Sequence, residues 1–186
     1  MPIRADVRAL LLCGLTVLGV ASLGCGRGSP ERAKITASAE TEYRAAITAV
    51  LDGWHAAAAA ADEEGYFKLL TPDAVFLGTD AAERWDVAAF RRYAHPHFAR
   101  GRAWRFKAVR RDIALHPSGD VAWFDEDLAT ENLGPARGSG VLVHDGATGA
   151  WRIAQYNLAL TVPNAQLAEV MRLVATHGSA PVPPAP

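Results

Sequence analysis

The sequence predicts an α+β domain with its helices first and an antiparallel sheet after them, and two observations support this. Apolar residues recur at helical spacing from Tyr43 to Ala58, whereas after Gly101 they alternate with a period of about 2 residues. Residues typical of turns (Gly, Pro, Ser and Asp) cluster between the alternating runs, as hairpins require. Helices that precede such strands pack as a layer on one face of the sheet.

Three helices are expected ahead of the sheet. The first is long and amphipathic, since one stripe of it carries apolar side chains: Tyr43, Ile47, Val50, Leu51, Trp54 and Ala58. A short second helix contains Tyr66 and stops before Pro72, because the residue ahead of a proline resists the helical conformation, and a strand over 74–77 follows. Asp86 is expected to cap the third helix, which Pro96 is expected to close.

Four strands are expected to form an antiparallel meander over residues 102–116, 121–131, 137–144 and 151–162. Turn residues at 117–120 and 145–149 separate them. After the sheet, Asn164 is expected to cap a last helix with one apolar stripe: Leu167, Val170, Met171 and Val174.

The composition is that of an ordinary single domain. Of the 186 residues, 50% are hydrophobic and 21% are charged, with 19 basic and 20 acidic residues and a formal net charge of -1. A net charge so close to zero gives no positive electrostatic potential that would attract the phosphates of a nucleic acid, so no nucleic acid partner is expected. Two cysteines cannot form a disulfide framework.

The N-terminal segment is typical of an exported protein. Arg4 and Arg8 flank the start of an apolar run over 9–23, which is shorter than the roughly 20 residues needed to span a bilayer, so residues 1–24 are interpreted as a signal peptide. Cys25 after a small residue resembles the lipobox of bacterial lipoproteins, which implies a lipid on Cys25 and attachment to a membrane of the bacterial envelope. The alternative is a secreted or periplasmic protein in which Cys25 has no role.

Three further segments complete the expected organisation. Residues 25–38 are rich in Gly, Ser and charge without periodicity and are expected to form a flexible tether. Residues 39–178 form the folded domain. Residues 179–186 are rich in proline and are expected to be a disordered tail.

The two faces of the sheet are assigned by closing each hairpin symmetrically about its turn. One face then contains Trp123, Asp125, Asp127, Gly138, Gly140, Leu142, Trp151, Ile153, Gln155 and Asn157. The opposite face contains Phe124, Glu126, Leu128, Arg137, Ser139, Val141, Ala154, Tyr156 and Leu158. A slip of one residue in either hairpin would exchange members between the faces.

The first face is interpreted as the wall of a ligand pocket, because Gly138 and Gly140 leave room beside large aromatic residues. The predicted ligand-binding residues are Trp54, Tyr66, Phe76, Trp104, Trp123, Gln155 and Asn157. Asp125 is the candidate catalytic residue, since burial in apolar surroundings would raise its pKa towards that of a general base. The alternative for Asp125 is a solvated position at the rim.

The opposite face is too apolar to be left in water, which favours a homodimer that contacts through Phe124, Val141 and Tyr156. Glu126 and Arg137 are expected to pair across adjacent strands of that face. No metal is expected, because the histidines at positions 55, 95 and 97 lack the spacing of a ligand set. No cofactor motif or phosphate-binding loop is present either.

Several segments together resemble the SnoaL-like branch of the nuclear transport factor 2-like superfamily, over roughly residues 41–163. They are Phe76-Leu77-Gly78-Thr79-Asp80, Glu83-Arg84-Trp85, Ala122-Trp123-Phe124-Asp125-Glu126, Arg137-Gly138-Ser139-Gly140-Val141-Leu142 and the run 151–158. The resemblance implies a cone-shaped α+β fold, in which a curved antiparallel sheet packs on a long N-terminal helix and shorter helices. It also implies a pocket between sheet and helix and frequent homodimers, but no particular reaction, since superfamily enzymes include ketosteroid isomerase, scytalone dehydratase and limonene epoxide hydrolase.

Three functions remain open at this point. The first is an exported, lipid-anchored protein that binds a small apolar molecule in its pocket. The second is a cofactor-independent isomerase or dehydratase with Asp125 as its general base. The third is an accessory subunit whose pocket is filled by its own tryptophans. Whether the protein is an enzyme is left undecided by the sequence.

Overall fold

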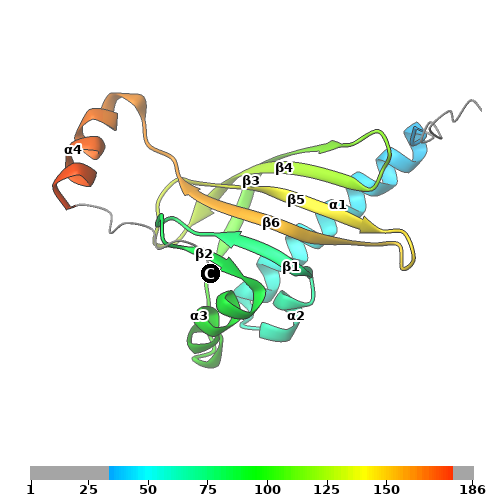
Figure 1. Cartoon of the computed structure of the whole chain (residues 1–186), viewed down its shortest axis with the longest axis horizontal. Coiled ribbons are helices and arrows are strands. Elements are labelled where there is room, and N and C mark those ends of the chain that lie inside the picture. Colours follow the sequence, from blue (N-terminus) through cyan, green and yellow to red (C-terminus); the bar gives the residue numbers. More distant parts are fainter. Residues whose placement is uncertain (1–33, 178–186) are drawn as a thin grey trace, which may run out of the picture. The chain divides into compact units, whose positions relative to one another are not determined.

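The computed structural model describes residues 34–177, so the expected signal peptide, Cys25 and the C-terminal tail lie outside the described residues. The elements in chain order are α1 (Ala37–Ala59), α2 (Glu63–Phe67), β1 (Leu70–Leu77), β2 (Arg84–Asp86), α3 (Val87–Ala99), β3 (Phe106–Leu115), β4 (Val121–Thr130), β5 (Ala136–Asp145), β6 (Ala150–Leu160), the short 3-10 helix η1 (Asn164–Gln166) and α4 (Leu167–His177). Helices precede most of the strands, as the α+β prediction requires (Figure 1).

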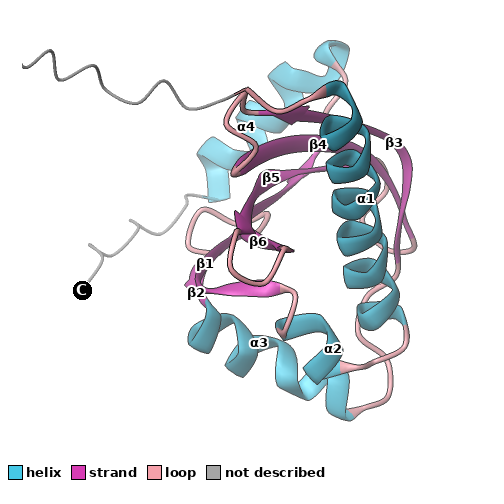
Figure 2. Ribbon diagram, turned by 90° about the vertical axis from the view of Figure 1, so that its right-hand side faces the viewer, coloured by secondary structure: helices cyan, strands magenta, loops and turns pink. Residues whose placement is uncertain are grey.

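The strands of the described part form one six-stranded sheet in the order β2-β1-β6-β5-β4-β3. The last four strands make the predicted antiparallel meander. Strand β1 adds to it in parallel with β6, and the short β2, which the sequence pattern did not predict, pairs antiparallel with β1. The sheet is curved and does not close, and α1 lies across one of its faces, against β3 and β6 (Figure 2).

The helices follow the predicted apolar stripes. Thr36 caps α1, and the buried positions on this helix include Ile47, Leu51, Trp54 and Ala58. Asp86 caps α3 as predicted, because its Oδ1 atom accepts a hydrogen bond of 2.7 Å from the backbone N–H of Ala89.

Two predicted boundaries are wrong. Helix α3 continues through Pro96 to Ala99, because burial of Phe98 holds the last turn and the proline ring lies on the exposed side. Strand β1 begins at Leu70, earlier than predicted, and includes Pro72, with a register irregularity between Leu70 and Val75.

The predicted assignment of the sheet faces is corrected at two places. In the β4–β5 hairpin, Glu126 pairs with Gly138 and Asp125 pairs with Ser139, a register one residue away from the symmetric one. In β6 an extra residue, Ala154, interrupts the ladder, because Ile153 pairs with Leu142 whereas Gln155 pairs with Val141. Because of this bulge, the odd-numbered residues Trp151 and Ile153 point to the interior before Ala154, whereas the even-numbered Tyr156 and Leu158 do so after it.

The interior face that results is almost entirely apolar. Its buried residues on the meander are Ala122, Phe124, Glu126, Leu128, Ala136, Gly138, Leu142, Trp151, Ile153, Tyr156 and Leu158. Phe124 and Tyr156, expected in a dimer contact, are 4% and 1% exposed inside the domain. Glu126 does not pair with Arg137, which points outward and lies 3.6 Å from Asp127.

Helix α4 differs from the others, because its apolar side chains are not buried. Leu167, Met171 and Val174 are 48%, 63% and 56% exposed. Its start is preceded by η1, in which Asn164 is the first residue and Pro163 the N-cap, so Asn164 does not cap a helix as predicted. Within residues 34–177, no helix is both long and apolar enough to cross a membrane.

Candidate functional site

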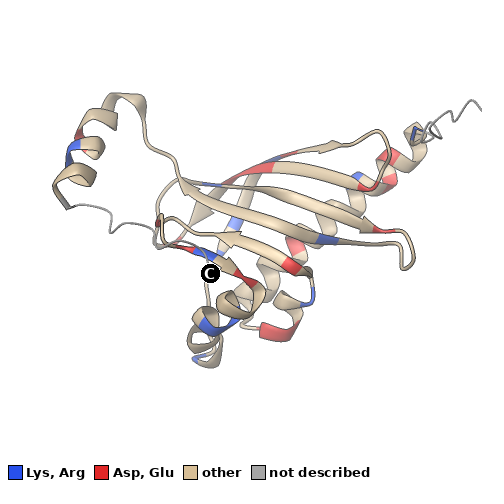
Figure 3. Cartoon of the chain, viewed as in Figure 1, with Lys and Arg blue, Asp and Glu red and all other residues tan. Residues whose placement is uncertain are grey.

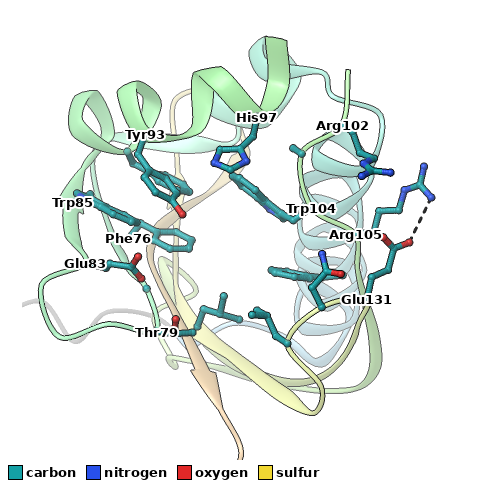
Figure 4. Close-up of a pocket in the computed structure, with 17 residues that line it drawn as sticks. Phe76, Thr79, Glu83, Trp85, Tyr93, His97, Arg102, Trp104, Arg105 and Glu131 are labelled. Atoms are coloured by element: carbon teal, nitrogen blue, oxygen red, sulfur yellow. Dashed lines mark hydrogen bonds and ion pairs between the residues drawn. The ribbon is translucent and has the colours of Figure 1, made fainter. Parts of the chain in front are cut away.

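A cavity of about 490 Å³ opens between the end of the sheet, α3 and the loops that follow α3 and β4 (Figure 4). Its lining residues are Phe76, Gly78, Thr79, Glu83, Trp85, Phe90, Tyr93, His97, Arg102, Ala103, Trp104, Arg105, Phe106, Glu131, Asn132, Leu133 and Leu158. The volume and the mixture of aromatic walls with a few polar groups are those of a small-molecule site.

Aromatic rings form a continuous wall on one side of this cavity. Phe76 of β1 stacks on Phe90 of α3, with ring centroids 4.0 Å apart and an interplanar angle of 18°. Trp85 stacks on Tyr93, with centroids 4.4 Å apart. The wall exists because the turn after β1 brings β2 back against α3, which places the rings of both elements on the same side.

The polar groups of the cavity lie at its rim and differ in sign from side to side. Glu83 lies on the loop between β1 and β2, whereas Arg102 and Arg105 lie on the opposite side, after α3 (Figure 4). Arg105 and Glu131 form an ion pair with 3.5 Å between Nη1 and Oε1. Over the described part of the molecule, acidic and basic residues are otherwise interspersed (Figure 3).

Of the predicted ligand-binding residues, the structure brings Phe76 and Trp104 to the cavity. Trp54 and Tyr66 lie behind the wall in the core, 1% and 0% exposed, with their rings stacked at 4.6 Å. Tyr66 in turn contacts Trp104 edge to face at 5.5 Å. These two residues therefore support the wall without lining the cavity.

The other predicted residues lie on the outer face of the sheet, so the interior position expected for Asp125 is wrong. Its Oδ1 atom accepts a hydrogen bond of 2.8 Å from Arg110, and its side chain is 46% exposed. Trp123, which is 50% exposed, shares that face. Gln155 and Asn157 follow them there, because the bulge at Ala154 turns both away from the interior. Asp125 cannot reach a molecule in the cavity from this position.

The two glycines expected to leave room for a ligand leave room for protein atoms instead. A methyl group on Gly138 would overlap the hydroxyl of Tyr156 and touch Glu126. One on Gly140 would overlap the backbone carbonyl oxygen of Gln155 beside the bulge. Both glycines are therefore required by packing inside the sheet.

A buried charged cluster, which was not predicted from the sequence, lies between α1 and the sheet. Glu126 is 0% exposed, and its Oε1 atom lies 2.6 Å from Nε2 of His55 and accepts a hydrogen bond of 3.2 Å from the Tyr156 hydroxyl. Its Oε2 atom accepts a 2.8 Å hydrogen bond from Nε of Arg111, whose Nη1 atom donates to Asp52 at 2.8 Å. Glu126 alternates with the buried Phe124 and Leu128, and this pattern was the available signal.

The partners of Glu126 determine its charge. Burial by itself raises the pKa of Glu126, but the hydrogen bond from His55 and the charge of Arg111 outweigh burial, so the pKa is lowered. Burial and the neighbouring carboxylate raise the pKa of Tyr156 well above its usual value, so its hydroxyl stays a donor. Glu126 is therefore an ionised acceptor whose bonding capacity is already used, and it does not line the cavity.

The histidines considered as metal ligands have separate roles. His55 contacts Glu126, His95 lies 2.8 Å from Glu63, and His97 lines the cavity. Within residues 34–177, no group of three or more His, Cys, Asp or Glu side chains has the geometry of a metal site.

Comparisons with known proteins place this geometry in a family. The profile of a family described as a SnoaL-like domain matches residues 47–163. A solved structure of a protein of unknown function from Mycobacterium tuberculosis superposes with a TM-score of 0.58 and 21% identity, covering 70% of this chain and 79% of that chain. No curated protein matches this chain.

Two further solved structures have the same fold at lower identity. A putative scytalone dehydratase from Novosphingobium aromaticivorans has a TM-score of 0.58 and 11% identity, covering 68% of this chain and 89% of that chain. An NTF2-like protein of unknown function from Pseudomonas putida has a TM-score of 0.54 and 15% identity, covering 70% of this chain and 92% of that chain. Identities this low establish a shared fold and no shared activity.

Proposed function

This chain belongs to the SnoaL-like domain family, and from the aromatic cavity of its fold we propose that it binds a small, largely apolar molecule. The observation that carries the proposal is the stacked wall of Phe76, Phe90, Trp85 and Tyr93 along a cavity of about 490 Å³. The rings are held nearly parallel by stacking on one another, and together they give the cavity an aromatic wall against which a planar ring can pack.

The ligand is an aromatic or fused-ring molecule of modest size. A drug-sized ligand fills pockets of about 300–1,000 Å³, so a cavity in the lower part of this range suits two or three fused rings. The core does not fill this space, because Trp54 stacks on Tyr66 behind the wall. That arrangement supports ligand binding over the accessory-subunit alternative, in which the tryptophans occupy the pocket.

Binding of 2-naphthol to the protein, measured by tryptophan fluorescence and by thermal shift, tests the proposal. Tyr93 lines the cavity and is 46% exposed, so Tyr93→Ala removes one ring of the wall without opening the core. We expect this variant to bind 2-naphthol about threefold to tenfold more weakly. The matched control is Trp123→Ala on the outer face, which is expected to bind like the parent. No binding by the parent, or equal losses in both variants, contradicts the proposal.

The outer face of the sheet is the proposed contact between two copies of the chain. Trp123 is 50% exposed and pairs across the strands with Val141, which continues the apolar surface. Exposed apolar groups on a sheet face support association with a second copy. Light scattering of the parent should give the mass of a dimer, and Trp123→Glu should give a monomer, whereas Leu133→Glu at the cavity should not. A parent that stays monomeric at high concentration contradicts this contact.

Cys25 is the proposed point of attachment to a membrane. Its support is the sequence alone: a short apolar run that ends at a small residue followed by cysteine. When the full chain is expressed in a bacterium that processes lipoproteins, the parent should be in the membrane fraction and Cys25→Ala should not. A variant that remains in the membrane fraction contradicts the lipid attachment.

A further inference from the structure

The charges at the rim of the aromatic cavity are arranged unevenly. Among the lining residues within 34–177, Glu83 lies on one side of the cavity, whereas Arg102, Arg105 and Glu131 lie on the other. Arg105 has Glu131 as a partner, whereas Arg102 forms no ion pair with any described residue. An unpaired guanidinium beside an apolar cavity offers five N–H donors to a ligand.

Other basic groups lie on the same side as Arg102. A second hollow shares His97, Arg102 and Asn132 with the cavity and is also lined by Arg100. Arg100 is the C-cap of α3, where its charge offsets the partial negative charge of the helix end. Arg102, two residues further on, lies beyond this helix end at the rim of the cavity, where it is exposed.

From this juxtaposition we infer that the ligand is an aromatic carboxylate, whose rings lie against Trp85, Tyr93 and Trp104 and whose acid group binds Arg102. This inference rests on the proposed function and names the class of molecule that the site takes. The planar guanidinium matches a carboxylate with two parallel hydrogen bonds, which an ammonium group does not do.

The position of the charge at the rim is consistent with the cost of burying ions. A carboxylate placed deep in the cavity would lose its hydration, whereas at the rim it keeps water on one side and the guanidinium on the other. The apolar rings then enter the cavity alone. Glu83 on the opposite side repels the acid group, so only one orientation of the ligand brings opposite charges together.

The test compares 2-naphthoate with 2-naphthamide, which has the same shape and no charge. We expect the protein to bind 2-naphthoate about tenfold more tightly than 2-naphthamide at low ionic strength, with the ratio falling as salt is added. Arg102→Gln should reduce the ratio to about one and leave the affinity for 2-naphthamide unchanged. Isothermal titration calorimetry measures both affinities.

The matched control is Arg92→Gln, which makes the same change on the exposed side of α3, away from the cavity lining. This variant should keep the preference for 2-naphthoate. Equal binding of both compounds by the parent, or the same ratio in Arg102→Gln and Arg92→Gln, overturns the inference and leaves the proposed function standing. Failure of the parent to bind either compound overturns the proposed function as well.

Discussion

Two neighbouring arginines of β3 pair with carboxylates on opposite faces of the same sheet. Arg110 is 48% exposed and lies 2.8 Å from both Asp125 and Asp127 on the outer face. Arg111 is 9% exposed and lies 2.8 Å from Glu126, which is 0% exposed, on the inner face. On each face an arginine lies 2.8 Å from a carboxylate, but the two pairs differ in their access to water.

That difference decides what each cluster contributes. Outside, water screens the charges, and the side chains lose conformational freedom when they pair, so the net contribution is small. Inside, the lost hydration of Glu126 must be compensated by all of its partners, and removing one member leaves buried charge without compensation. The inner cluster also joins α1 to the sheet, because His55 and Asp52 belong to the helix.

The largest expected effect separates the two clusters directly. Glu126→Ala leaves Arg111, His55 and the Tyr156 hydroxyl without their shared acceptor, and we expect a loss of about 3–5 kcal/mol in the free energy of unfolding. Asp125→Ala on the outer face should leave that free energy nearly unchanged. Urea unfolding followed by circular dichroism measures both. If Glu126→Ala does not fold, Glu126→Gln, which keeps the shape of the side chain, should give a smaller loss of unfolding free energy. A Glu126→Gln variant as stable as the parent would contradict the difference between the two clusters.

The second prediction concerns the space that holds the Tyr156 hydroxyl against Glu126. An added methyl group in Gly138→Ala overlaps that hydroxyl, and we expect a loss of about 1–3 kcal/mol in the free energy of unfolding. Ser139→Ala, the next residue, lies on the outer face and is the matched control. Equal effects of the two changes would show that the inner cluster needs no such space.

The inner cluster is also expected to make stability depend on pH. Because the pKa of Glu126 is lower in the folded domain than in the unfolded chain, its contribution is fully present above the unfolded value of about 4.3 and is lost as the pH falls through the folded value. The groups that face it are His55, Arg111 and Tyr156. The difference in unfolding free energy between the parent and Glu126→Gln should therefore shrink below about pH 4.3. If the difference in unfolding free energy stays constant as the pH falls below about 4.3, the pKa of Glu126 is not lowered in the folded domain.

The smallest change in stability is expected for the cluster around Arg110 on the outer face. The hydrogen bond from Arg110 lowers the pKa of Asp127, but both groups are in water, so Arg110→Ala should change the stability very little. In the same variant, an NMR titration should show the pKa of Asp127 moving up towards its ordinary value. Added salt, at about 0.5 M, should produce the same upward movement in the parent. A large loss of stability in Arg110→Ala would remove the distinction between the faces.

Much of the fold could be predicted from local sequence patterns, whereas most of the site could not. Helix α1 and the meander follow from the period of apolar residues, which local sequence carries. The cavity residues come from β1, the β1–β2 loop, β2, α3, the loop after α3, the start of β3, the β4–β5 loop and β6. Only the completed sheet brings those segments together. Phe76 and Trp104 were therefore identified by their aromatic character, whereas Arg102 and Tyr93 were missed.

Alternating apolar residues identify the strands from local sequence. They also limit Asp125 and Glu126 to opposite faces, because successive side chains on a strand point in opposite directions. Which of the two lies inside was decided by the tertiary structure, through the register of the β4–β5 hairpin and the bulge at Ala154. A shift of one residue reverses every side chain of a strand, and its direction depends on contacts between strands that are distant in the chain. Glu126 lies inside because His55, Arg111 and Tyr156, from three other elements, meet its carboxylate there.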